Sequence, residues 1–417
     1  MSPVECPVEA AITGIGVVAP NGLTIDDYWN SVLAGKSGLR HITRFDATPY
    51  ACRVAGEVPG FVETDHMPGR LVPQTDRWTH LGLAAAAMAL DDAGVDPAAL
   101  PEYDMAVVTA SSSGGTEFGQ REIEALWRRG PRSVGAYQSI AWFYAATTGQ
   151  TSIRYGMRGP CGVLATEQAG GLDALAQARR LLRGGSRMVM TGGADASLCP
   201  YGLVAQTANG LLSGSDDPGN AYQPFGRTAR GYVPGEGGAM FVMEDADAAT
   251  GAPYGVLAGY MATFDPPPGV DRPPGLERAV RGALGDAGCD PGDIDVVFAD
   301  SAGVARLDRL EADAITAVFG PRGVPVTAPK TMTGRLYAGG AALDVATALL
   351  AIRDGVIPPT AGAYDLADGI DIDLVRGGPR PAAVRTALVI ARGYGGFNAA
   401  LVLRGRPAGA TTTEGRV

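Results

Sequence analysis

A glycine pair followed by an alanine-rich segment occurs twice in the chain, once in each half. The first copy is GGLDALAQARRLLRGG at 170–185, and the second is GGAALDVATALLAIRDG at 339–355. Each copy has Leu-Asp after the glycines, apolar residues at helical spacing, and a basic residue before a closing glycine. This repeat predicts that the chain is a duplication of one α/β unit with an amphipathic helix in each half.

The stretch DADAATGAPYG at 245–255 lies between the two copies and is polar, small and rich in turn-forming residues. We therefore expect an N-terminal half over 1–250 and a C-terminal half over 251–417. The last 12 residues, RPAGATTTEGRV, show no periodicity and are expected to be loose.

Strand and helix signals alternate along the first part of the chain. The segment 11–18 is rich in β-branched residues and predicts a buried strand, and 104–115 predicts a strand that runs into a Gly/Ser turn. Between them, 24–38 and 77–94 carry the caps and closing glycines of helices. This alternation predicts a layered α/β fold.

Composition excludes several classes of protein. The net charge of -10 argues against binding to nucleic acid or to an anionic membrane. The longest apolar run, LGLAAAAMAL, is about half of what a membrane span needs, and the first 18 residues hold two acids and no base. We therefore expect a cytoplasmic protein. No metal site or disulfide is expected, because no C-x-x-C pair occurs among Cys6, Cys52, Cys161, Cys199 and Cys289.

The stretch VLATEQAGGLDALAQARRLLRGG at 163–185 is built like a helix start that presents one reactive side chain. The residue at the presenting position is Gln168, a carboxamide, which is not a nucleophile. Cys161 lies seven residues earlier, on the expected strand, where we predict a buried structural cysteine.

Several glycine-rich segments, in this order and spacing, resemble those of the β-ketoacyl synthase family. The resemblance covers nearly the whole chain and implies a thiolase-like fold, in which two similar α/β halves form a layered αβαβα architecture. The segments are ITGIGVVAPNG, TEQAGGLDA, PFGRTARGYVPGEGGAMFVMED, PKTMTGRLYAGGAALDVATALL and ARGYGGFNAALVL.

Condensing members of this family use one cysteine nucleophile and two histidines. The resemblance places the cysteine position at Gln168 and the histidine positions at Asp300 and Arg335. The chain has only three histidines, and all lie before residue 81. The resemblance therefore implies that no catalytic residue is intact, whereas the surrounding scaffold is retained at Gly170, Gly171, Glu236, Glu311, Lys330, Gly395 and Gly396.

Glutamine in the context EQAGGLDA is similar to the chain length factor, or ketosynthase β subunit, of type II aromatic polyketide synthases. The resemblance implies an obligate heterodimer with a catalytic ketosynthase α subunit, and extension units that arrive on acyl carrier protein. The phosphopantetheine of that carrier would serve the complex, and this chain itself would bind no cofactor. Its expected work is to shape a tunnel for the growing poly-β-ketone chain.

Family positions with gating roles in the tunnel correspond to Thr109, Ser112 and Thr116. All three are small, which predicts a long product, a decaketide or beyond. Alternatively these residues only pack, and neighbours such as Phe118, Trp142 or Phe143 refill the space. The segment VGAYQSIAWFYA at 134–145 is expected at the heterodimer interface, where its side chains either pack in the core or the interface or line the tunnel directly.

Two other functions stay open. Gln168 could hydrogen-bond the thioester of malonyl-carrier protein and support decarboxylation, which would prime the chain with acetyl. The missing histidines count against this, because no neutral imidazole remains to stabilise the enolate. A free-standing acyl-binding protein is the third class, and the retained interface segments count against it.

Overall fold

The computed structural model of the 417-residue chain describes residues 8–249, 251–267, 269–270, 272–362 and 364–406. The predicted loose tail at 406–417 lies, apart from its first residue, outside the described residues. No helix in this described part combines the length and the apolar composition needed to cross a bilayer.

The sheet of the first half runs in the order β5-β4-β6-β7-β1. β5, β4 and β6 are parallel, and β7 is antiparallel to both of its neighbours. β1, β4, β6 and β7 are buried because both of their faces are covered, whereas β5 is partly exposed. The strands are β1 (Ala10–Val18), β4 (Met105–Ala110), β5 (Cys161–Leu164), β6 (Met188–Ala196) and β7 (Glu236–Asp245).

The sheet of the second half repeats this arrangement in the order β10-β9-β14-β15-β8. β10, β9 and β14 are parallel, and β15 is antiparallel to both of its neighbours. Each half therefore places its strands in the order third, second, fourth, fifth, first. The strands are β8 (Gly255–Phe264), β9 (Val296–Phe298), β10 (Pro325–Thr327), β14 (Thr386–Gly393) and β15 (Phe397–Arg404), with β12 (Asp373–Leu374) beyond β10.

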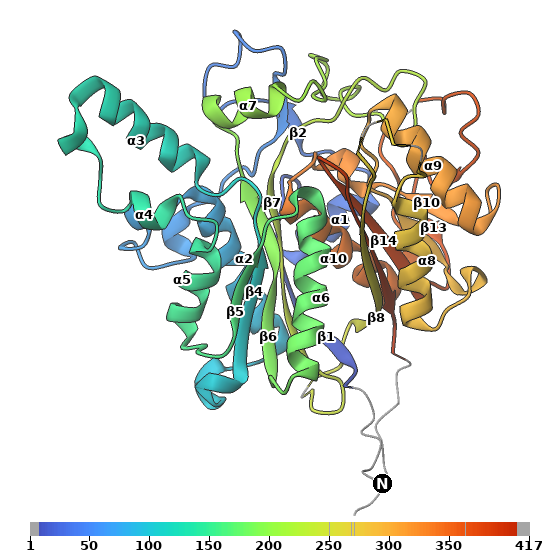
Figure 1. The fold of residues 1–417 in the computed structure, drawn as a ribbon, viewed down its shortest axis with the longest axis horizontal. Helices are drawn as coiled ribbons and strands as arrows, with labels where there is room; N and C mark the ends of the chain where they lie inside the picture. Colours follow the sequence, from blue (N-terminus) through green and yellow to red (C-terminus); the bar gives the residue numbers. More distant parts are fainter. Residues whose placement is uncertain (1–7, 250, 268, 271, 363, 407–417) are drawn as a thin grey trace, which may run out of the picture.

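The two halves join through one antiparallel contact between β1 and β8, where Ala11 pairs with Val256 and Ile12 with Gly255. Figure 1 shows α6 (Gly170–Arg183) and α10 (Ala338–Asp354) between the two sheet regions. α2 (Arg77–Ala93) and α5 (Ala146–Tyr155) cover the outer side of the first region, and α8 (Leu276–Ala287) and α9 (Ala305–Phe319) that of the second. The predicted α/β fold with two similar halves in αβαβα layers is confirmed.

The remaining elements connect these layers. β7 ends at Asp245 and β8 begins at Gly255, so the connection spans the predicted boundary at 250/251, which stays a prediction. The connecting elements are α1 (Ile25–Leu33), α3 (Thr116–Arg129), α4 (Gln138–Ala141), α7 (Pro200–Thr207), the pair β2 (Leu39–His41) with β3 (Val54–Gly56), and the pair β11 (Val356–Ile357) with β13 (Arg380–Pro381).

The two repeated segments form the central helices α6 and α10. Their glycines are needed because the helices approach closely: a Cβ on Gly171 would lie 2.6 Å from the carbonyl oxygen of Ala338 and from the nitrogen of Ala342. The expectation of two amphipathic helices holds for α6 only, because α10 is buried on all sides from Ala338 to Ala351. Tertiary position therefore decides which copy keeps a polar face.

The prediction that Cys161 is buried is wrong. Cys161 does lie on β5, as expected, but β5 is the outermost strand of its sheet and the cysteine is exposed. An apolar strand with a free edge is unusual in a monomer, because its unpaired backbone groups can pair with another chain.

We predict that Gly171→Ala lowers the free energy of unfolding by about 1–3 kcal/mol or more, because the new methyl group overpacks the helix crossing. The measurement is urea unfolding of the purified protein. Gly285→Ala in α8 is the control, since no atom lies within 4 Å of its added Cβ, and it should be neutral or stabilising by at most about 1 kcal/mol. Equal effects of the two changes would contradict the crossing as the cause.

Candidate functional site

The three positions that the resemblance assigns to catalytic residues, here named the vacated site, lie in loops at the carboxyl ends of parallel strands. Gln168 sits between β5 and α6, Asp300 follows β9, and Arg335 lies between β10 and α10. In layered α/β folds, this end of the strands is where ligands bind. The structure brings Asp300 and Arg335 into direct contact and places Gln168 against the start of α10.

The carboxylate of Glu167 fixes the turn that precedes α6 through hydrogen bonds. Glu167 has a φ of 54°, and its Oε2 accepts hydrogen bonds of 2.8 Å from the nitrogens of Gln168 and Tyr394. The second bond fixes the β14–β15 turn, where Gly395 and Gly396 have φ values of 90° and 108° that side chains disfavour. Burial raises the pKa of Glu167, and Arg335 partly offsets this.

Gln168 is only 4% exposed, and its amide pairs with the backbone of Tyr337. With Nε2 assigned toward the carbonyl, it donates to the oxygen of Tyr337 at 3.0 Å, and Oε1 accepts from the nitrogen of Tyr337 at 3.2 Å. The opposite assignment would set donors against donors and acceptors against acceptors. Tyr337 is the N-cap of α10 and has a φ of 51°, so Gln168 satisfies backbone groups where the chain turns sharply.

Asp300 and Arg335 form a buried bidentate ion pair. Nη1 of Arg335 lies 2.9 Å from Oδ2 of Asp300, and Nη2 lies 3.0 Å from Oδ1. The guanidinium also donates to the carbonyl oxygens of Asp300 and Arg392, and the nitrogen of Arg392 donates to Oδ1. Most of the polar capacity of both side chains is thus used inside the protein.

The charges of this pair hold each other ionised. Burial alone would raise the pKa of Asp300, but Arg335 and Lys330 hold it below its ordinary value. Burial disfavours the guanidinium, but Asp300 raises the pKa of Arg335 well above its usual range. The ring of Tyr232 lies under the guanidinium at 5.6 Å, which adds a cation–π contact.

The retained scaffold residues hold the backbone around this pair. Glu311 on α9 accepts from the nitrogens of Asp300 at 2.6 Å and Ser301 at 2.8 Å, and burial together with Asp300 raises its pKa to about 7. Lys330 pairs with Asp344 of α10 at 2.6 Å. Burial still raises the pKa of Asp344 to about 6, because full desolvation outweighs the lysine.

Glu236 stands apart from this group. It begins β7 and binds Arg77 of α2, with its two oxygens 2.7 and 2.8 Å from the guanidinium. Oε1 also accepts from the nitrogen of Val58 at 2.9 Å. Glu236 therefore fixes the outer helix of the first half, not the vacated site.

Of the predicted gate positions, Thr109 lies on β4 near its carboxyl end, and Ser112 and Thr116 follow the strand. The hydroxyl of Thr109 bonds that of Thr148 on α5 at 2.7 Å, so it faces the outer helices. The nitrogen of Ser112 donates to the carboxylate of Asp195 at 3.0 Å. Thr116 is the first residue of α3.

Asp195 is a structural residue that the sequence reasoning missed. Its carboxylate is fully buried and accepts from Ser111, Ser112 and Ser113, and from the nitrogen of Ala338 at 3.1 Å. Asp195 thereby connects the loop at 111–113, which follows β4, to the start of α10. Burial raises the pKa of Asp195 to about 6, and the serine hydrogen bonds oppose this. An aspartate in the strand segment GGADAS was the only available signal.

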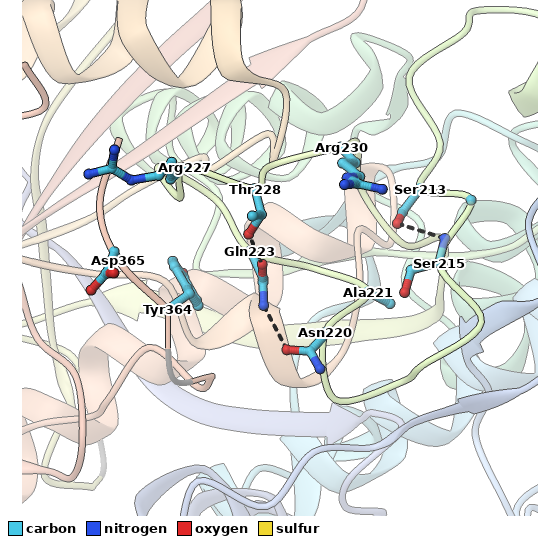
Figure 2. A pocket seen from close by; sticks show the side chains of 11 residues that line it. Ser213, Ser215, Asn220, Ala221, Gln223, Arg227, Thr228, Arg230, Tyr364 and Asp365 are labelled. Carbon is cyan, nitrogen blue, oxygen red and sulfur yellow. Dashed lines mark hydrogen bonds between the residues drawn. The ribbon is translucent and has the colours of Figure 1, made fainter. Parts of the chain in front are cut away.

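A surface cavity of about 770 Å³ lies apart from these residues (Figure 2). Most of the residues that line it carry polar side chains, among them Ser213, Asn220, Gln223, Arg230 and Tyr364. None of the predicted site residues lines it. Among the described residues, no group of histidine, cysteine and carboxylate side chains is arranged to hold a metal ion.

The vacated site therefore offers little for acyl condensation. A neutral amide cannot carry a thioester, and the Gln168 amide is engaged with backbone. The carboxylate of Asp300 would repel an enolate, and Arg335 already forms an ion pair with Asp300. The arrangement neutralises and fills the site.

We predict that Arg335→Gln lowers the free energy of unfolding by about 3–5 kcal/mol, because it leaves Asp300 buried without its counterion. The double variant Asp300→Asn/Arg335→Gln removes both charges and should lose less than the single variant. Urea unfolding of the three proteins measures this. A double variant that is less stable than the single variant would contradict the ion-pair interpretation.

Family models match both halves of the chain. The beta-ketoacyl synthase N-terminal domain matches residues 9–249, and the beta-ketoacyl synthase C-terminal domain matches residues 254–363. Among solved structures, the ishigamide ketosynthase/chain length factor superposes with a TM-score of 0.88 at 26% identity, covering 96% of this chain and 100% of that one. A beta-ketoacyl synthase from Burkholderia phymatum gives a TM-score of 0.87 at 23% identity over 96% and 100% of the two chains, which supports the fold.

Curated relatives are more similar in sequence. The tetracenomycin polyketide synthase ketoacyl synthase beta subunit of Streptomyces glaucescens is 58% identical over 96% of this chain and 99% of its own length. The actinorhodin polyketide putative beta-ketoacyl synthase 2 of Streptomyces coelicolor is 57% identical over 94% and 98%. The chain therefore belongs to the beta-ketoacyl synthase family, among the ketoacyl synthase beta subunits of polyketide synthases.

Proposed function

We propose that this chain is the non-catalytic β subunit, or chain length factor, of a heterodimeric ketosynthase in type II aromatic polyketide biosynthesis, acting in the cytoplasm. The observation that carries the proposal is the state of the three catalytic positions. An amide bonded to backbone occupies one, and a buried ion pair occupies the other two. These groups stabilise the fold and leave the chemistry to a partner.

The partner is a ketosynthase α subunit that supplies the cysteine and both histidines. Acyl carrier protein delivers malonyl units on its phosphopantetheine, and this chain binds the growing poly-β-ketone without holding a cofactor itself. A poly-β-ketone carries repeated reactive carbonyls, so it needs an enclosed, dry tunnel to avoid premature reaction. This chain forms part of the tunnel wall and limits its depth.

The free edge of β5 is the first element of the proposed interface. The carbonyls of Pro160 and Leu164 accept from the nitrogens of Val107 on β4 and of Ser111 directly after it, both at 3.1 Å. Because bonding alternates along a strand, the backbone groups of Val163 point to the open edge. This edge can continue the sheet into a partner of the same fold.

The second element is the aromatic segment that leads from α4 into α5. Its large side chains are exposed in the isolated chain, with Trp142 at 51% and Phe143 at 60%. Such a concentration on one segment is typical of an interaction surface, since aromatic residues are enriched in interfaces. The exposed residues are Tyr137, Ile140, Trp142, Phe143 and Tyr144.

The small residues Thr109, Ser112 and Thr116 are the proposed gate. Their size leaves volume at the end of β4, which favours a long product, a decaketide or beyond.

We predict that the chain is less stable and less soluble when expressed alone than when its ketosynthase α subunit is co-expressed, and that co-expression yields a heterodimer. Val163→Pro removes an outward N–H while leaving the bonds to β4, so it should weaken assembly at least 10-fold. Size-exclusion chromatography and titration calorimetry measure this. Val62→Ser, at an exposed valine outside both interface elements, is the control. Assembly that Val163→Pro leaves unchanged would exclude the β5 edge.

The alternative, a Gln168-dependent malonyl-carrier decarboxylase, has less support because the amide is bonded to Tyr337. We predict that a heterodimer whose α-subunit cysteine is replaced by alanine releases no more CO2 from malonyl-carrier protein with Gln168 than with Gln168→Ala. Release of labelled CO2 is the measurement. A residual release that disappears with Gln168→Ala would establish the decarboxylase instead.

A further inference from the structure

We infer that Trp142, and not only the small residues at the end of β4, determines how far the polyketide chain can extend. This inference rests on the proposed function, since it names a specificity-determining residue of the same tunnel wall. It follows from how the segment 141–144 lies on the start of α3, directly beside Thr116.

Three glycines allow this segment to lie against α3. A Cβ on Gly115 would lie 2.1 Å from the carbonyl oxygen of Ala141, and one on Gly114 would lie 2.9 Å from that of Trp142. The nitrogen of Gly115 donates to the oxygen of Trp142 at 3.3 Å, and Ala141 is fully buried. The backbone of residues 141 and 142 is therefore fixed on the residues that precede Thr116.

Gly119, the third glycine, contacts the indole ring of Trp142. A Cβ on Gly119 would lie 3.0 and 3.1 Å from Cδ1 and Nε1 of Trp142, so the ring is in contact with the helix surface there. Gly119 is buried and lies three residues after Thr116, which places the two on one face of α3. A large side chain at 119 would prevent the indole from taking this position.

The indole is therefore a large, rigid group next to a set of small ones. Thr109, Ser112 and Thr116 present only hydroxyls and methyls, and Thr109 is turned toward Thr148. A ketide chain that passes Thr116 would next meet the ring of Trp142. The Cδ1–Nε1 edge of the ring lies against Gly119, and about half of the residue is open for a ligand or partner to cover.

The neighbouring aromatic residues are placed less well for this role. Phe143 is more exposed than Trp142, and no glycine among the described residues has its ring as a near neighbour. Tyr144 lies 3.6 Å from a Cβ built on Gly114, which precedes Thr116 and is not part of α3. Phe143 is thus a matched control: an adjacent aromatic residue on the same exposed surface that is not seated on α3.

The test is the length of the polyketide made by the reconstituted complex. The heterodimer with its ketosynthase α subunit is supplied with acyl carrier protein and malonyl units, and products are sized by mass spectrometry. We expect Trp142→Ala to shift the main product to a length at least one two-carbon unit longer, and Trp142→Phe to give a smaller shift or a mixture. Phe143→Ala should leave the length unchanged.

Thr116→Phe separates this inference from the proposed function. If Thr116→Phe shortens the product while Trp142→Ala leaves it unchanged, the wall lies at Thr116, and the role of Trp142 is overturned although the chain still controls length. If no variant in an assembled, active complex changes the length, the tunnel function itself fails. If Trp142→Ala does not assemble, Trp142→Phe decides, and an unchanged product with that variant overturns the inference.

Discussion

The close crossing of α6 and α10 is the constraint on which the rest of the structure depends. Only glycine at 171 lets the two helices approach with backbone against backbone. This contact sets the separation of the two sheet regions and brings the loops of both halves to one place. Gln168 precedes one helix and Tyr337 the other, so their paired hydrogen bonds lie beside the crossing and connect the halves where their chemistry would have been.

The vacated site is as highly structured as a working one. Its charges are paired, its backbone donors are met by Glu167 and Glu311, and its turns have backbone angles that reactive sites often use. An interior that contains several carboxylates is stable only if each has cations or N–H donors around it. This network holds the interior together without a cysteine or a histidine at positions 168, 300 and 335.

The fold could be predicted from the sequence because its main signals are local and repeated. The glycine pairs at 170 and 339 marked the central helices, and the resemblance placed Gln168, Asp300 and Arg335. The direct pairing of Asp300 with Arg335 could not be predicted in this way, because tertiary packing alone brings the loop after β9 against the loop between β10 and α10. The exposure of Cys161 was missed for a related reason: strand composition does not tell which strand ends a sheet.

The ion pair of Asp300 and Arg335 also affects how such a chain can evolve. A change of either residue to histidine would leave the other charge buried without its bidentate partner. A lineage returning toward catalysis would have to cross that unstable intermediate or change both codons at once, and a cysteine at 168 would bring no benefit until then. The salt bridge therefore favours continued specialisation of the two subunits of such a complex once they have diverged.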